Sequence, residues 1–182
     1  MEKKDIRAEI FRRRRQTDPV WLQETSRVIC DRILQSREFE QSGTVFAYMD
    51  CKGEVSMKRL LEACWNMGKP LAVPKVIGED MKFYIISGYE DVAPGYFQVP
   101  EPTTEIEAAD EGALMIVPGV AFDSHRHRCG YGKGFYDRYL SRHRDHPTIG
   151  AAFDFQIVDR IPADPHDICP DQVVTERHIY KK

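Results

Sequence analysis

The chain has 182 residues, of which 42 % are hydrophobic and 30 % charged, and its formal net charge is −3 at pH 7. This composition predicts one globular domain spanning residues 1–182, and the slightly acidic balance argues against general binding to nucleic acid or to an anionic membrane. No apolar run reaches the ~18 residues of a membrane span, and the five cysteines form no C-x-x-C pair. We therefore expect a cytoplasmic protein with reduced thiols.

Residues 3–15 predict a helix that carries several cations. Lys3, Lys4 and Arg7 lie near its start, where positive charge opposes the helix dipole, so a nearby anion would explain them. Solvated lysines at a chain end are the alternative. The run Arg12–Arg15 points all round the helix axis and cannot form one binding face, so we expect it to be mostly solvated.

Predicted helices and strands alternate along the rest of the chain. Asp18 is suited to cap a helix that begins at Pro19, and Gly68 is suited to end a later one. The alternation predicts an α/β fold with a mainly parallel sheet between helical layers and with ligands at the carboxyl ends of the strands. Helices are expected at 19–35, 57–67 and 135–143, strands at 44–49, 71–76, 82–87, 113–117, 148–153 and 172–175, and long connections at 91–110 and 157–167.

A glycine-rich basic loop follows the predicted strand 113–117 and leads into the predicted helix at 135–143. Glycine permits positive φ and close approach to a ligand, and successive N–H groups followed by a helix N-terminus favour an anion. The G-x-G-x-G spacing fits neither the Walker A loop nor the dinucleotide fingerprint. A tight structural turn with a solvated lysine is the alternative. The segment contains Arg128, Gly130, Tyr131, Gly132, Lys133, Gly134, Phe135 and Tyr136.

Four further positions carry groups that could do chemistry. Asp137, just after the loop, is placed to hold Mg²⁺ beside bound phosphates, or it is an acid stabilised by the helix dipole. His125 and His127 are too few for a structural zinc site. Cys129 has no evident partner base, so we expect it to pack in the interior.

Residues 116–140 resemble the signature of the 5-formyltetrahydrofolate cyclo-ligase family. The family's Pro-Gly-hydrophobic-Ala-Phe-Asp segment is present as Pro118–Asp123, its Arg-Leu-Gly as Arg128–Gly130, and its Tyr-Gly-x-Gly-Tyr-Tyr-Asp-Arg as Tyr131–Arg138. The family's usual glycine before the arginine is replaced within Ser124–His127, and its leucine is Cys129. Two other departures are Met57, in the segment where the family has threonine, and Gln98, where it often has glycine.

The resemblance implies a Rossmann-like three-layer fold and an ATP- and Mg²⁺-dependent conversion of 5-formyltetrahydrofolate to 5,10-methenyltetrahydrofolate. It implies a monomer whose partners are ATP and a reduced folate, with no nucleic acid and no membrane. Lys133 and Arg128 would be the catalytic cations. ATP would be bound by Lys3, Lys4, Arg7, Arg128, Gly130, Tyr131, Gly132, Lys133, Gly134, Phe135 and Tyr136. Folate would be bound by Met49, Glu54, Tyr131, Gly132, Lys133, Gly134 and Phe135, and Mg²⁺ by Asp137 and Asp167.

Glu54 is the candidate for the folate ring. It follows the first predicted strand, and a carboxylate there could accept hydrogen bonds from the adjacent N–H and NH₂ groups of a pterin. An acid before the next helix is the alternative. Two rival functions stay open: a different ATP-dependent ligase on the same scaffold, and a non-catalytic nucleotide- or RNA-binding module that uses Arg12–Arg15.

Overall fold

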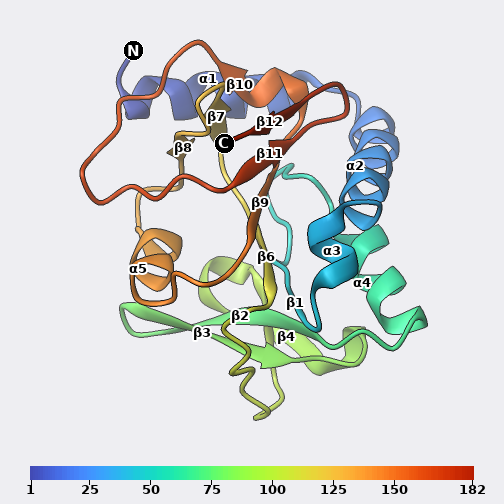
Figure 1. Ribbon diagram of the computed structural model, residues 1–182. Helices are drawn as coiled ribbons and strands as arrows, with labels where there is room; N and C mark the ends of the chain where they lie inside the picture. The colour runs from blue at the N-terminus through green and yellow to red at the C-terminus, as the bar shows by residue number, and fades with distance from the viewer.

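A seven-stranded sheet forms the centre of the computed structural model, which describes residues 1–182 (Figure 1). The strand order is β12-β11-β9-β6-β1-β2-β3. The five inner strands run parallel, and the two edge strands pair antiparallel with their neighbours. This confirms the predicted α/β class with a mainly parallel sheet. The strands are β1 (Val45–Phe46), β2 (Leu71–Ile77), β3 (Asp80–Ile85), β6 (Leu114–Val117), β9 (Thr148–Ala151), β11 (Gln172–Val174) and β12 (Ile179–Lys181).

Helices cover both faces of the sheet, on opposite sides in Figure 1. Helices α2 (Pro19–Leu34), α3 (Arg37–Gln41) and α4 (Lys58–Asn66) pack on one face, and α5 (Phe135–Arg142) packs on the other. Helix α1 (Lys3–Gln16) lies away from both groups, against a small sheet of strand order β10-β7-β8. That sheet consists of β7 (Ala121–Asp123), β8 (Arg128–Cys129) and β10 (Ile157–Val158).

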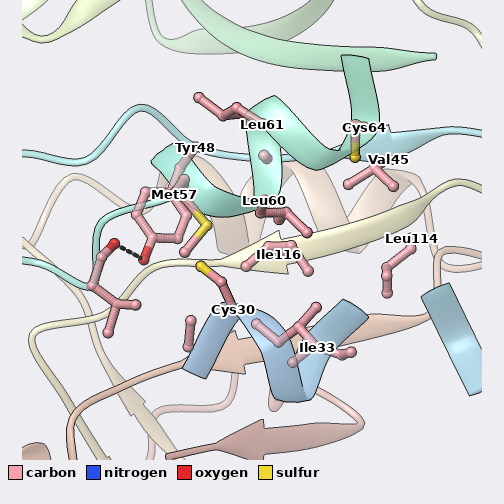
Figure 2. Packing of buried hydrophobic residues seen from close by; sticks show 14 of the residues in the cluster. Cys30, Ile33, Val45, Tyr48, Met57, Leu60, Leu61, Cys64, Leu114 and Ile116 are labelled. Carbon is pink, nitrogen blue, oxygen red and sulfur yellow. Dashed lines mark hydrogen bonds between the residues drawn. The ribbon is translucent and has the colours of Figure 1, made fainter. Parts of the chain in front are cut away.

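Every residue of strand β6 is buried, because its side chains alternate between two cores. Leu114 and Ile116 face α2 and α4, whereas Met115 and Val117 face α5. Figure 2 shows Ile116 beside Cys30 of α2 and residues of α4. Complete burial of such a side chain contributes roughly 1.5–3 kcal/mol, so this strand, which precedes β7 and β8 in the chain, is firmly held.

Several predicted element boundaries are confirmed. Asp18 caps α2 by accepting a hydrogen bond from the Val20 backbone N–H at 3.1 Å, and Pro19 is its first residue. Gly68, just beyond α4, has a φ of 69°. Within α2, Val28 is exposed, because the helix turns Ile29 and Ile33 toward the sheet.

The predicted long connection at 91–110 contains a short hairpin. Strands β4 (Val92–Pro94) and β5 (Pro100–Pro102) pair antiparallel around the 3₁₀ turn η2 (Tyr96–Gln98). The predictions also lacked β7, β8, β10 and the edge strand β12, all of two or three residues. Two further 3₁₀ turns are η1 (Tyr89–Asp91) and η3 (Asp154–Gln156). None of the helices combines the length and the apolar character needed to cross a membrane.

Candidate active site

The basic glycine loop runs from β8 into α5 and opens onto a cavity of about 270 Å³. Gly132 and Gly134 have φ values of 97° and 68°, a region that side-chain-bearing residues rarely adopt, and Gly134 directly precedes α5. The backbone of the loop therefore depends on these two glycines. The cavity is lined by Lys3, Arg7, Arg128, Gly130, Tyr131, Gly132, Lys133, Gly134, Phe135, Tyr136, Asp137, Asp164 and Asp167.

The start of α1 forms one wall of this cavity. Arg7 donates a hydrogen bond from Nε to the Gly130 carbonyl at 2.7 Å, which joins the helix to the loop. Lys3 Nζ lies 2.6 Å from Asp167 and 2.7 Å from Asp164. Lys4, by contrast, is exposed and does not line the cavity. Two of the three N-terminal cations are thus brought to the loop from more than 120 positions away in the sequence.

Opposite charges hold the Lys3 contact in place. Burial alone would lower the pKa of Lys3, but the hydrogen bonds to Asp164 and Asp167 raise it above the ordinary value. Burial alone would raise the pKa of Asp167, but the Asp164 backbone N–H and Lys3 lower it overall. Both groups are therefore charged at neutral pH.

Arg128 and Asp137 form a second ion pair at the cavity, with Nη2 and Oδ2 2.8 Å apart. The Arg128 side chain is only 7 % exposed, and its guanidinium lies 5.8 Å from the centre of the Tyr136 ring. The other Asp137 oxygen accepts a hydrogen bond from the Ile168 backbone N–H at 3.0 Å. Asp137 is therefore more than an acid at a helix start, because it neutralises a buried arginine.

The two predicted metal ligands lie on the same cavity but in no larger cluster. The protein has no group of three or more His, Cys, Asp or Glu side chains placed to hold a metal ion. Two carboxylates still fit Mg²⁺, which binds through one or two carboxylates, phosphate oxygens and several waters. Asp137 and Asp167 are therefore suited to a Mg²⁺ ion that arrives with a phosphorylated ligand, and not to a permanent protein-only site.

Glu54 lies beside the loop at a buried corner, with 8 % of its surface exposed. One carboxylate oxygen accepts a hydrogen bond from the Tyr131 hydroxyl at 2.8 Å, and the other accepts one from the Cys51 backbone N–H at 2.9 Å. Burial raises the pKa of Glu54 above its ordinary range. Met49 packs against the core between α2, α4 and the sheet and does not line the cavity.

Arg14 was expected to be solvated with the rest of the Arg12–Arg15 run, and this is wrong. Arg14 is 4 % exposed and donates hydrogen bonds to the Gly119 and Lys52 carbonyls and to the Tyr131 hydroxyl. The signal was in the sequence, because Ile6, Ile10 and Arg14 recur every four residues on the buried stripe of α1. Its neighbour Arg12 does lie on the surface, where it pairs with Glu9.

Phe97 is a second residue at the site that the sequence predictions omitted. It is 63 % exposed and has a φ of 54°, and its ring centre lies 5.9 Å from both Lys52 Nζ and Lys133 Nζ. The hairpin β4–β5 thus places an aromatic ring at the loop. Gln98, next to it, has a φ of 61°, a conformation that glycine adopts more readily than a residue with a side chain.

His127 and Cys129, next to the loop, are held by contacts within the protein. His127 Nδ1 lies 2.9 Å from the completely buried carboxylate of Asp123, which also accepts three backbone N–H bonds. Cys129 is fully buried, as expected, and burial raises the pKa of its thiol. Arg126 adopts a φ of 70°, a conformation that glycine favours. A separate cavity of about 340 Å³, between β3 and α5, contains none of the predicted site residues.

A basic glycine loop between the short antiparallel strand β8 and the N-terminus of α5, set on an α/β fold, defines a protein suited to anionic ligands. The model of the 5-formyltetrahydrofolate cyclo-ligase family matches residues 1–176, and the chain belongs to that family. The family and the ligase class expected from the sequence are thereby confirmed.

Known relatives match this chain over most of its length. A 5-formyltetrahydrofolate cyclo-ligase of Escherichia coli is 27 % identical, over 94 % of this chain and 99 % of that protein. The solved structure of a 5,10-methenyltetrahydrofolate synthetase from Aquifex aeolicus has 31 % identity and a TM-score of 0.88, and covers 100 % of this chain and 93 % of that one. The corresponding enzyme of Mycoplasma pneumoniae has 25 % identity and a TM-score of 0.73, over 96 % and 98 % of the two chains.

Proposed function

We propose that this protein is an ATP- and Mg²⁺-dependent cyclo-ligase that converts 5-formyltetrahydrofolate to 5,10-methenyltetrahydrofolate with release of ADP and phosphate. The observation that carries the proposal is one cavity lined by Lys3, Arg7, Arg128 and Lys133, with Glu54 hydrogen-bonded to Tyr131 of the same loop. Cations and glycine N–H groups suit a triphosphate, and the buried acid suits a folate ring with paired donors. The reaction would take place in a monomer in the cytoplasm.

The chemistry needs positioned charge and no covalent nucleophile. The formyl oxygen attacks the γ-phosphorus of ATP. The bond between that phosphorus and the oxygen bridging it to ADP breaks, and a phosphate ester of the formyl group forms. The neighbouring folate nitrogen then attacks the activated carbon, loses its proton, and inorganic phosphate leaves with the formyl oxygen. Catalysis of such a transfer is mostly orientation and stabilisation of charge on the phosphoryl oxygens.

Each part of the cavity has a proposed task. Lys133, which is exposed and forms no hydrogen bond through its ammonium, is free to follow the transferred phosphoryl group, with Arg128 as the second catalytic cation. The loop glycines and Lys3 and Arg7 would bind the phosphates of ATP. Phe97 and Phe135 would contact the folate. Asp137 and Asp167 would hold Mg²⁺, which neutralises phosphate charge.

The rival function as an RNA-binding module loses its main support in this structure. Arg14 is buried, and Arg12 and Arg13 are both paired with Glu9, so the run does not present four free cations to a nucleic acid. The phosphate contacts that RNA binding requires would have to come from elsewhere on an acidic protein.

The deciding experiment mixes the purified protein with ATP, Mg²⁺ and 5-formyltetrahydrofolate and follows the absorbance of methenyltetrahydrofolate together with ADP release. We expect equal amounts of both products, and none without ATP. Lys82→Ala, on strand β3 away from the cavity, is the control and should react like the wild type. Absence of methenyltetrahydrofolate from a folded wild-type protein would refute the proposal, and ADP release with another acceptor would favour the second ligase hypothesis.

A further inference from the structure

Arg14 is a buried cation that lies beside the cavity without lining it. It forms no ion pair; its guanidinium donates to the Lys52 carbonyl at 3.2 Å, the Gly119 carbonyl at 3.0 Å and the Tyr131 hydroxyl at 3.1 Å. Burial of an unpaired charge is costly, and neutral acceptors offset only part of that cost. The position therefore calls for a reason other than stability.

The contacts of Arg14 join three segments around the proposed folate site. Lys52 belongs to the turn before Glu54, Gly119 follows strand β6, and Tyr131 lies in the glycine loop. Gln156 also donates to the Gly119 carbonyl at 3.0 Å, so that carbonyl keeps a partner if Arg14 is removed. The contact with Tyr131 has no such substitute.

The hydrogen bond to Tyr131 has a fixed direction. A guanidinium has no acceptor, so Arg14 must donate to the Tyr131 oxygen, and the single phenol proton is directed to Glu54 Oε1, 2.8 Å away. Donation from a cation makes the phenol a stronger donor, because consecutive hydrogen bonds polarise one another. The three side chains thus form one relay from α1 to the buried carboxylate.

We propose that Arg14 is a positioning residue of the folate site, which acts through Tyr131 to keep the Glu54 carboxylate ionised and in one orientation for the pterin donors. This role rests on the proposed function. It differs from the roles given to Lys3 and Arg7, because Arg14 is separated from any ligand in the cavity by the tyrosine.

The groups that face Glu54 support this assignment. Tyr136 of α5, Tyr48 after β1, and Asp50 and Cys51 of the following turn are neutral or negative. Two other cations are near: Lys52 Nζ lies 5.5 Å from the centre of the Tyr131 ring, and Arg128 lies beside Tyr136, but Arg14 is the cation that acts on Glu54 itself. Burial and Asp50 raise the pKa of Glu54, and the Cys51 N–H, the Tyr131 hydroxyl and Arg14 oppose that rise. Removal of Arg14 should therefore favour the protonated acid, which carries an O–H donor on one oxygen and no longer matches the paired donors of a pterin.

The test measures kcat/KM for 5-formyltetrahydrofolate, at saturating ATP and Mg²⁺, from about pH 5.5 to 8.5. For Arg14→Gln we expect the acid limb of the profile to move to higher pH by about one unit, because loss of an opposite charge at this range shifts a pKa by that order. Arg14→Lys keeps the charge and should leave the limb near its wild-type position. Arg15→Gln, at the neighbouring exposed position, is the matched control and should match the wild type.

Each outcome separates the two proposals. An inactive wild-type protein refutes the proposed function, and the role of Arg14 falls with it. An active wild type with an unmoved limb in Arg14→Gln refutes only the role of Arg14. If circular dichroism shows that Arg14→Gln does not fold, Tyr131→Phe decides, because it breaks the relay and leaves Arg14 in place. The same upward shift supports the relay, and an unmoved limb refutes it.

Discussion

The loop cavity and the Glu54 corner adjoin each other, yet they hold their charges differently. At the cavity, Lys3 and Arg128 are paired with carboxylates, while Lys133 reaches solvent with no hydrogen-bonding partner. At the corner, Glu54 is buried and receives two hydrogen bonds, from a backbone N–H and from Tyr131. The first arrangement leaves charges that an incoming phosphate can recruit. The second arrangement fixes one acceptor before any ligand is present.

This difference suggests two ways of using binding energy. Cations that meet a transferred phosphoryl group act most strongly when charge develops, so their loss lowers turnover. An acceptor fixed on the remote ring contributes about equally to substrate and transition state, so its loss raises KM. Substitutions in the two regions should therefore change different kinetic constants, which tests the division directly.

The largest effect is expected for Lys133→Ala. We expect turnover to fall about 10²- to 10³-fold, because one stabiliser of phosphoryl charge is lost. The melting temperature should stay the same, since the exposed ammonium forms no hydrogen bond and lies 5.9 Å from the centre of the Phe97 ring, which is itself exposed. Steady-state kinetics and thermal unfolding measure the two quantities, with Lys82→Ala as the control. Wild-type turnover in the folded variant would remove Lys133 from the mechanism.

Glu54→Gln tests the other region. The amide keeps the size of the side chain but turns one acceptor into a donor, and we expect the folate KM to rise about thirty-fold, roughly 2 kcal/mol. The ATP KM should change little, because the substituted group belongs to the buried corner and not to the phosphate cavity. Both KM values are measured at saturating co-substrate. A raised ATP KM with an unchanged folate KM would reverse our placement of the two ligands.

The sequence predicted the local structure of the loop better than the contacts at the Glu54 corner, and the reason is the range of the interactions. The loop 130–134, its glycines and the start of α5 follow one another in the chain, so local patterns were enough to predict a site for an anion. The hydrogen bond between Glu54 and Tyr131 joins positions 77 residues apart and depends on how β1 and β6 pair in the sheet. No local pattern specifies such a contact.

The errors in the predicted fold also come from contacts between residues far apart in the sequence. Strands β7, β8 and β10 have only two or three residues, so they show no periodicity, and they exist because they pair with one another next to α1. The burial of Arg14 follows from that packing and overrides the usual exposure of arginine. Arg126 and Gln98 adopt positive φ, a conformation that glycine favours, so the tertiary structure imposes it on less suitable residues.

Asp137→Asn tests whether the carboxylates of the cavity bind a metal ion in addition to pairing with Arg128 and Lys3. We expect a higher Mg²⁺ requirement, because one negative oxygen ligand is lost. We also expect a loss of about 1–3 kcal/mol in the free energy of unfolding, since Arg128 is nearly buried and loses its partner. Mg²⁺ titration of the initial rate and urea unfolding measure these effects separately.

The control for this substitution is Asp80→Asn. Asp80 pairs with Arg142 at the same 2.8 Å, but both side chains are more than half exposed, so stability should hardly change. If Asp137→Asn loses stability while its Mg²⁺ titration matches that of the wild type, the carboxylate serves only Arg128, and the metal proposal fails.

The smallest effect is expected for the Lys3–Asp167 pair, and it depends on pH. The pKa of Asp167 is lowered in the folded protein, so its contribution is present above the unfolded value near 4 and is lost as pH falls through the folded pKa. The pKa of Lys3 is raised, so its contribution is complete below about 10 and is lost at higher pH. Asp167→Asn should therefore lower the free energy of unfolding by roughly 0.5–1 kcal/mol between about pH 5 and 9, and by much less near pH 2.

Urea unfolding across this range is the measurement, with Asp159→Asn as the control, since Asp159 is exposed and forms no ion pair. A difference that persists unchanged at pH 2 would mean that Asp167 stabilises the segment through its hydrogen bond from Asp164, and not through the charge of Lys3.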